Sequence, residues 1–131
     1  MSCNDVCVVM DYDCCNEFYR DGFRHARKEH RCCECGETIA KGSYHHHATG
    51  KAHGEFWENR TCSECHEIRV VFSCDGWVFG ELWESVDDQL FSRWDEMKAI
   101  DCLSRLTTQS AIDKMRGKYA EYRREWGDEA Q

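Results

Sequence analysis

The sequence predicts an α+β fold, in which a small cysteine-bearing β-hairpin module is followed by a C-terminal helical region. Three observations lead to this prediction. Two CxxC pairs, Cys32/Cys35 and Cys62/Cys65, enclose short segments with strand and turn signals. Apolar residues then recur with helical spacing beyond residue 80. The 131 residues, 41% of them hydrophobic, suffice for one domain with a modest core.

The two CxxC pairs predict one tetrahedral zinc site. A pair with this spacing forms a tight turn, the zinc knuckle, from which two thiolates reach one ion at about 2.3 Å. Gly36 directly follows the first pair, where this turn often needs a positive φ, whereas His66 follows the second. The spacer, residues 36–61, exceeds the roughly 15 to 20 residues of common sites. We expect one structural zinc ion in a zinc-ribbon-like module, bound by Cys32, Cys35, Cys62 and Cys65.

The charge and the cysteine content restrict the possible environments and partners. A net charge of −8 argues against a protein that works mainly by coating phosphate backbones. The segment MSCNDVCVVMDYD has no basic region followed by a long apolar run, and no stretch is apolar enough for a membrane span. We therefore expect a cytoplasmic protein without a membrane segment, whose reduced thiols bind metal. Arg31 and Lys41, near the first pair, would offset the negative charge of a four-thiolate site.

We expect three segments: an acidic, cysteine-rich N-terminal segment at 1–19, a zinc-binding module at 20–80 and a C-terminal helical region at 81–131. The N-terminal segment allows a second metal site, but its cysteines are irregularly spaced. A loosely ordered tail with free thiols is the alternative. These cysteines are Cys3, Cys7, Cys14 and Cys15. Cys74 and Cys102 are expected to be buried as small apolar groups.

Strands are predicted on both sides of the first pair. Residues 20–31 are basic and lead directly into Cys32, which favours a strand over a helix. Thr38–Ala40 and Ser43–His45 flank Lys41-Gly42, which predicts a hairpin. Gly50 and Gly54 predict a loop before a short aromatic strand at 55–57. The basic patch at 24–31, which contains Arg24, Arg27, Lys28 and Arg31, is either a solvated stretch or a phosphate-contacting surface.

Helices are predicted from the second pair onwards. Ile68, Val71 and Phe72 predict a helix that begins near Cys62. A second, acidic helix is expected at 81–99, and it carries an apolar stripe of Leu82, Val86, Leu90, Phe91, Trp94 and Met97. Ser110 with Asp113 predicts a capping-box start for the last helix. The last helix carries an apolar stripe of Ile112, Met115, Tyr119, Tyr122 and Trp126, and it ends at Gly127. We expect both stripes to pack in the core, with docking of a partner as the alternative.

The histidine run His45–His47 is the candidate catalytic feature. Together with Asn59 and His66 it resembles the HNH endonucleases, in which a ββα unit braced by two CxxC pairs holds a divalent metal. This resemblance implies His46 or His47 as the general base, Asn59 as the residue that orients it, and His66 as a metal ligand. The chain lacks the proline that usually follows the histidine pair of that family. Exposed histidines, or histidines that support the zinc thiolates, are the alternative.

A second resemblance covers residues 18–126. It rests on ARKEHRCCECGETIAKGSY, RTCSECHEIR, CDGWVFGELWE, CLSRLTT and KMRGKYAEYR, which are similar to segments of small zinc-binding proteins encoded by bacteriophages and prophages. This resemblance implies a non-enzymatic phage accessory protein in the host cytoplasm. We expect a protein-interaction module with a host or phage protein as its partner. The alternatives are an HNH-like metal-dependent endonuclease and a nucleic-acid-binding zinc protein that uses the 24–31 patch.

Overall fold

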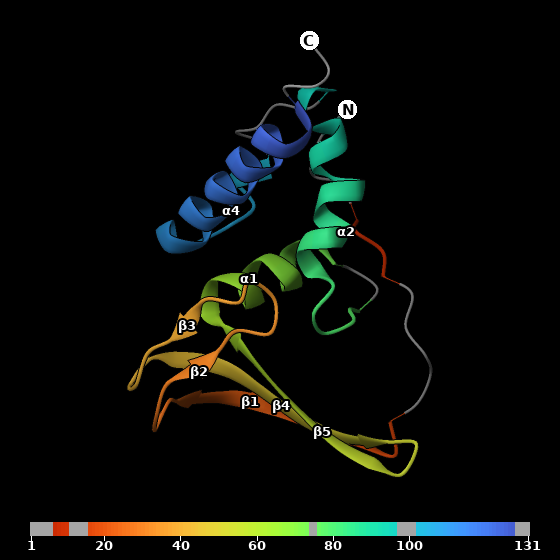
Figure 1. The fold of residues 1–131 in the computed structure, drawn as a ribbon, viewed down its shortest axis with the longest axis vertical. Helices are drawn as coiled ribbons and strands as arrows, with labels where there is room; N and C mark the ends of the chain where they lie inside the picture. Colours follow the sequence, from red (N-terminus) through yellow and green to blue (C-terminus); the bar gives the residue numbers. More distant parts are fainter. Residues whose placement is uncertain (1–6, 11–15, 74–75, 97–101, 128–131) are drawn as a thin grey trace.

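The computed structural model describes residues 7–10, 16–73, 76–96 and 102–127. Its strands are β1 (Phe18–His25), β2 (His30–Arg31), β3 (Thr38–Ile39), β4 (Tyr44–Ala52) and β5 (Glu55–Cys62) (Figure 1). Its helices are α1 (Ser63–Phe72), α2 (Leu82–Gln89), the 3-10 helix η2 (Phe91–Glu96), α4 (Gln109–Tyr122) and the π-helix η3 (Arg123–Gly127). The predicted α+β class is confirmed, with an antiparallel sheet, a four-cysteine cluster and a C-terminal helix.

None of the helices among the described residues combines the length and the apolar character needed to cross a membrane.

The main sheet has the strand order β1-β4-β5, and both pairings are antiparallel. His53 and Gly54 have positive φ angles of 53° and 80°, and they form the tight turn between β4 and β5. Gly50 lies within β4 and not in the predicted loop, and the aromatic strand runs on to Cys62. Gly50 faces Trp57, and a Cβ at this glycine would lie 2.6 Å from the indole Cε2. Glycine is therefore used here for close packing within a strand.

A small second sheet pairs β2 with β3 across the first CxxC turn, with His30 opposite Ile39. The predicted hairpin of 38–40 with 43–45 is therefore wrong, although residues 41–42 do form a turn. Ala26 donates to the Ser43 carbonyl and accepts from the Gly42 amide, so the chain after this turn joins β1. The strand predicted at 20–31 is present as β1 and β2, with a break between them.

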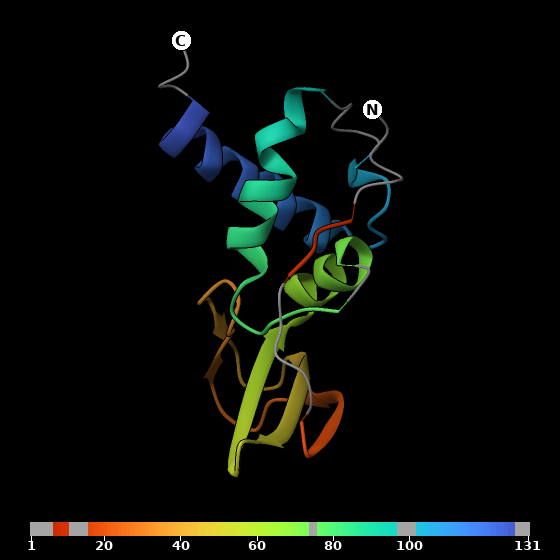
Figure 2. The same ribbon diagram turned by 90° about the vertical axis from the view of Figure 1, so that its right-hand side faces the viewer.

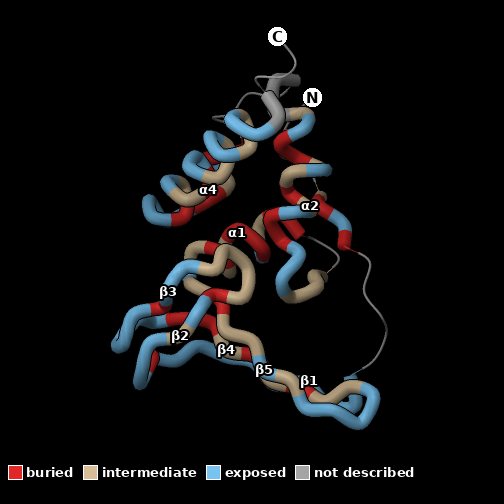
Figure 3. Tube along the Cα trace, in the orientation of Figure 1, coloured by how far each residue is buried: buried red, intermediate tan, exposed pale blue. Residues whose placement is uncertain are grey.

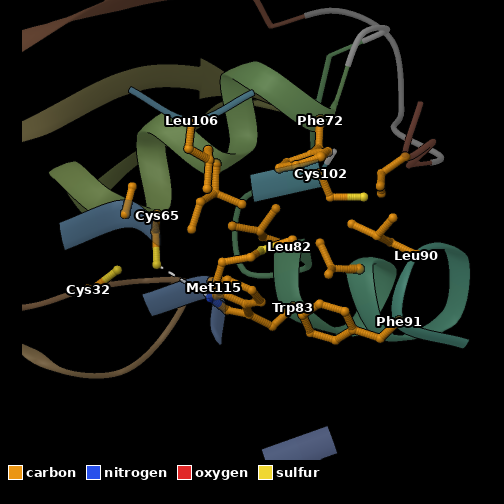
Figure 4. Close-up of a cluster of buried hydrophobic side chains, with 14 of the residues drawn as sticks. Cys32, Cys65, Phe72, Leu82, Trp83, Leu90, Phe91, Cys102, Leu106 and Met115 are labelled. Carbon is orange, nitrogen blue, oxygen red and sulfur yellow. Dashed lines mark hydrogen bonds between the residues drawn. The ribbon is translucent and has the colours of Figure 1, made fainter. Parts of the chain in front are cut away.

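Helix α1 lies between the main sheet and the helices α2 and α4 (Figures 1 and 2). Its buried residues Ile68 and Phe72 belong to one hydrophobic core with residues of α2 and α4 (Figures 3 and 4). Met115 of the last helix is fully buried in this core, and Ile112, Tyr119 and Tyr122 pack against it. The predicted packing role of this stripe is thus confirmed for its described side chains.

Both C-terminal helices begin or end differently from the prediction. Helix α2 stops at Gln89, and side chains of the following residues cap its last carbonyl groups: Ser92 donates to the Asp88 carbonyl and Arg93 donates to the Gln89 carbonyl. The chain continues as η2, and Met97 lies outside the described residues.

Helix α4 begins after Thr108 and not at the predicted capping box. The Glu67 carboxylate of α1 accepts from the Thr107 and Thr108 amides at 2.7 and 3.3 Å. A residue from another helix therefore satisfies the free amides at this helix start.

Candidate metal centre

The structure brings the four cysteines of the two CxxC pairs together. Their sulfur atoms all lie within 4.8 Å of one another, and the sulfurs of Cys35 and Cys62 are 3.9 Å apart. Metal–sulfur bonds of about 2.3 Å in a tetrahedron place the sulfurs about 3.8 Å apart. Cys32 and Cys65 are buried, and Cys35 and Cys62 are partly buried. This group can hold a metal ion.

The backbone around each pair directs the thiols inwards. Gly36 has a φ of 76° and donates its amide to the Cys32 carbonyl, so the first turn has the predicted positive φ. The amides of Glu34 and Cys62 each lie 3.4 Å from the Cys32 sulfur. The second pair needs no such glycine, because α1 begins at Ser63, directly after Cys62. His66, which follows this pair, is therefore a helical residue and not part of a turn. Thiolates at a helix N-terminus also benefit from the helix dipole.

Lys114 of α4 supplies the positive charge at this centre. Its Nζ lies 3.2 Å from the Cys35 sulfur, 3.7 Å from the Cys62 sulfur and 2.5 Å from a Glu37 carboxylate oxygen. Burial lowers the pKa of Lys114, but the Glu37 carboxylate and the thiolates outweigh it, so the net pKa is raised. The charge was expected from Arg31 and Lys41. Instead, Arg31 donates to the Gly36 carbonyl, and Lys41 lies in an exposed turn.

The four thiols of the cysteine group perturb one another's pKa values. Hydrogen bonds from the neighbouring cysteines hold the pKa of Cys32 below its ordinary value. Hydrogen bonding to the same neighbours raises the pKa of Cys62 and of Cys65. Four thiolates this close repel one another, so a divalent cation that binds there displaces protons.

The other cysteines stand apart from this group. Cys33 lies 3.3 Å from the Thr61 hydroxyl, and burial raises the pKa of its thiol. Cys7 and Cys102 each take part in a disulfide, in contrast to the expected reduced thiols, although Cys102 is fully buried as predicted. The remaining ones, Cys3, Cys14, Cys15 and Cys74, lie outside the described residues. The alternative of a second metal site in the N-terminal segment is therefore untested.

A buried network around Arg69 adjoins the cysteine group. Its guanidinium donates to Glu34 at 2.8 Å and to Thr61 at 3.1 Å. The guanidinium carbon also lies 4.6 Å from the centre of the Trp77 ring. The other Glu34 oxygen accepts from the Leu82 amide at the start of α2. Figure 4 shows a further link, in which the Trp83 indole of α2 donates to the Cys65 sulfur at 3.4 Å.

His46 and His66 stack within this network. Their ring centres are 3.9 Å apart, and Arg69 Nη2 lies 3.3 Å from the Nδ1 atom of His46 and 2.8 Å from that of His66. His46 Nε2 is 2.9 Å from Asp21 Oδ2. Burial holds the pKa of both rings down, and that of His66 falls to about 4. Both imidazoles are therefore neutral at pH 7 and accept hydrogen bonds from Arg69.

The residues of the HNH resemblance are only partly brought together. His46 and His66 meet, but His47 pairs with Glu58 at 2.7 Å on the opposite face of the sheet. Asn59 lies opposite Ala48, further along β5. Arg69 lies beside both Nδ1 atoms and occupies them as hydrogen-bond acceptors, so neither of these nitrogens is free for a metal ion. Across the described residues, the four cysteines form the one group of three or more histidine, cysteine or carboxylate ligands close enough to hold an ion.

All four residues of the predicted basic patch are exposed, and the phosphate-contacting role of the patch stays a prediction. Arg24 lies on β1, Arg27 and Lys28 lie in the exposed connection to β2, and Arg31 is bonded to the Gly36 carbonyl.

In comparisons with known proteins, no family model, no curated protein and no solved structure matches the chain.

Proposed function

We propose that this chain is a non-enzymatic zinc-binding protein that acts as a protein-interaction module in the host cytoplasm, as the phage accessory proteins that it resembles would. The observation that carries the proposal is the four-cysteine group, with its sulfurs within 4.8 Å of one another. Four thiolates in a tetrahedral arrangement favour zinc or an iron–sulfur cluster. Four protein ligands also leave zinc no open position for a substrate, which is typical of structural sites.

The surroundings of the group support a structural role for the metal. Glu34 lies between Cys32 and Cys35, and its carboxylate bonds both to Arg69 of α1 and to the start of α2. Lys114 connects the centre to α4. A metal ion that fixes the two CxxC pairs would therefore fix three helices relative to the sheet. Structural zinc sites contribute on the order of 10 kcal/mol to folding in small domains.

The position of Arg69 disfavours the endonuclease alternative. A permanently charged guanidinium beside His46 and His66 opposes the binding of a second cation there. Incubation of zinc-loaded protein with DNA and magnesium or manganese should give no cleavage. Cleavage that disappears in both His46→Ala and His66→Ala would overturn the non-enzymatic proposal.

An acidic hollow on the helical half is the surface that we assign to the protein partner. It has a volume of about 410 Å³ and is lined by Glu84, Asp87, Asp88, Ser92 and Tyr122. Burial raises the pKa of Asp87, and the nearby carboxylates of Glu125 and Asp88 raise it further. A lysine or arginine side chain of a partner would relieve this repulsion and hold the carboxylates ionised.

The partner proposal is tested by affinity capture from bacterial lysate with tagged, zinc-loaded protein. We expect one protein in stoichiometric amount, its capture reduced at least tenfold by Asp87→Asn/Asp88→Asn. Glu55→Gln, which removes an exposed carboxylate at the start of β5, is the matched control and should capture as much as the parent. Equal capture by all three proteins would exclude the hollow as the interface.

A further inference from the structure

The main sheet has an outer face that α1 does not cover. Strand alternation and the observed register place Thr61 and His46 on the inner face, where both contact Arg69 of α1. The next residue along each strand points the other way. The outer face consists of Phe18, Arg20, Gly22 and Arg24 from β1, His45, His47, Thr49 and Lys51 from β4, and Phe56, Glu58 and Arg60 from β5. Of these, His45 is fully buried. Figure 3 shows that β1 is exposed along its whole length.

The outer face is positively charged, although the whole chain carries −8. It holds four arginine or lysine residues and one carboxylate, that of Glu58. Arg60 pairs with Glu58 at 3.6 Å, and Lys51 pairs with Glu17 at 3.5 Å. Arg20 and Arg24 are exposed, and neither forms an ion pair with a carboxylate of the described ranges. Two guanidinium groups are therefore available to an anion.

These two arginines flank a hollow of about 270 Å³. Gly22 lies between them in sequence and opposite His47 in the sheet, and a Cβ at this glycine would meet nothing within 4 Å. The missing side chain leaves the floor of the hollow open. Thr49 also lines it and adds a hydroxyl donor. The Asp21 carboxylate at its edge is engaged by His46 at 2.9 Å. Guanidinium and hydroxyl donors around an open floor suit a phosphate group.

Aromatic rings are exposed at one end of the same face. Phe18 and Phe56 are 42% and 73% exposed, with ring centres 5.8 Å apart. Lys51 Nζ lies 5.3 Å from the Phe56 ring centre. Phe18 is four residues before Gly22 on β1, which corresponds to about 13 Å along a strand. A short stretch of extended polynucleotide spans this separation.

We propose that the outer face binds single-stranded nucleic acid, with a backbone phosphate between Arg20 and Arg24 and a base stacked on Phe56. Exposed rings on a sheet can stack only on bases whose faces are free, which favours a single strand over a duplex. This activity goes beyond the proposed function, because it uses the sheet, at the end of the molecule away from α2 (Figure 1). The acidic hollow is lined by residues of α2. The surface shares only Arg24 with the sequence-predicted 24–31 patch.

The test measures fluorescence anisotropy of labelled oligo(dT) and oligo(U) with full-length, zinc-loaded protein at several salt concentrations. Parent affinity should fall steeply with salt, and Arg20→Gln/Arg24→Gln should bind at least tenfold more weakly with a smaller salt slope. Phe56→Ala should bind roughly 5- to 150-fold more weakly with an unchanged slope. Arg116→Gln, an exposed arginine on α4, is the matched control and should behave as the parent does. Far-UV circular dichroism and a cooperative thermal transition like those of the parent show that each variant is folded.

Three outcomes would overturn the proposal. The first is no binding by the parent at low salt. The second is equal affinity of the parent and Arg20→Gln/Arg24→Gln. The third is binding of duplex DNA, or of an acidic peptide, as tight as that of oligo(dT) and unaffected by Phe56→Ala. This last result would assign the face to a duplex or to an acidic protein segment instead.

Discussion

Arg69 donates a hydrogen bond of 2.8 Å to Glu34, and both side chains are fully buried. Glu34 belongs to the first CxxC turn and Arg69 to α1, so this ion pair joins the metal centre to the helical core. The second Glu34 oxygen accepts from the amides of Gly80 and Leu82, which extends the connection to α2. The cysteine group and the core therefore form one structural unit.

Glu34→Gln should destabilise the zinc-loaded protein strongly. The substitution leaves a buried guanidinium without its carboxylate, and the loss of one partner from a buried pair costs about 3–5 kcal/mol. Urea denaturation measures the free energy of unfolding, and Glu55→Gln serves as the control because Glu55 is exposed. A loss no larger for Glu34→Gln than for the control would contradict the structural role of this ion pair.

Lys114→Met should weaken zinc binding. The methionine keeps the apolar contacts of the stem but removes the ammonium group, which lies 3.2 Å from the Cys35 sulfur. Loss of such a supporting contact typically lowers metal affinity by about 10- to 100-fold. Competition with a chromophoric chelator measures the affinity. Lys41→Met, in an exposed turn, should retain the parent's affinity for zinc. Similar zinc affinities for the two variants would be evidence against charge compensation by Lys114 of α4.

Gly50→Ala and Gly117→Ala should change the melting temperature in opposite directions. A Cβ at Gly50 would lie 2.9 Å from the Phe18 carbonyl oxygen as well as against the Trp57 indole, so we expect a loss of about 1–3 kcal/mol. A Cβ at Gly117, inside α4, meets nothing within 4 Å, and alanine should add about 0.5–1 kcal/mol. Thermal denaturation of the two zinc-loaded variants provides the comparison. A tolerated alanine at position 50 would show that Trp57 packs elsewhere.

The sequence predicted those features that depend on local spacing. The CxxC pairs and the helix after Cys62 follow from intervals of a few residues, and both are present. The partner of β3 was mispredicted, because strand register depends on residues distant in the chain. Gly50 was assigned to a loop because glycine usually marks turns, whereas here it accommodates Trp57.

The charged network could not be predicted in the same way. Glu34 and Arg69 are 35 residues apart in the chain, and Cys35 and Lys114 are 79 apart. Both contacts join residues from different secondary-structure elements, and no local pattern distinguishes these charges from those at the surface. The HNH resemblance did mark His46 and His66, which do meet, but it gave no sign of the arginine between them.

The stability of the protein should fall as the pH drops below about 6.5, in part because of His66. Burial, with His46 and Arg69 contributing, lowers its pKa to about 4 in the folded protein. The unfolded chain, with an ordinary histidine pKa near 6.5, takes up the proton first. The contribution of His66 to the free energy of unfolding is therefore complete above pH 6.5 and is lost progressively as the pH falls towards 4.

Urea denaturation at pH 7.5 and 5.5 measures this effect. The loss of stability between the two pH values should be smaller by about 1 kcal/mol in His66→Asn than in the parent. His53→Asn, in the exposed turn between β4 and β5, should lose as much as the parent. The same pH dependence in all three proteins would show that His66 is protonated normally in the folded state.

The metal content of purified, reduced protein tests the central claim most directly. The cysteine group should hold about one zinc ion per chain in the parent. Cys33→Ser should hold as much, because the Cys33 sulfur hydrogen-bonds to the Thr61 hydroxyl outside the group. Cys62→Ser should lose most of the metal together with its near-UV circular dichroism signal. A parent that carries no zinc after purification, or a Cys62→Ser variant that keeps both its zinc and its tertiary structure, would contradict the account.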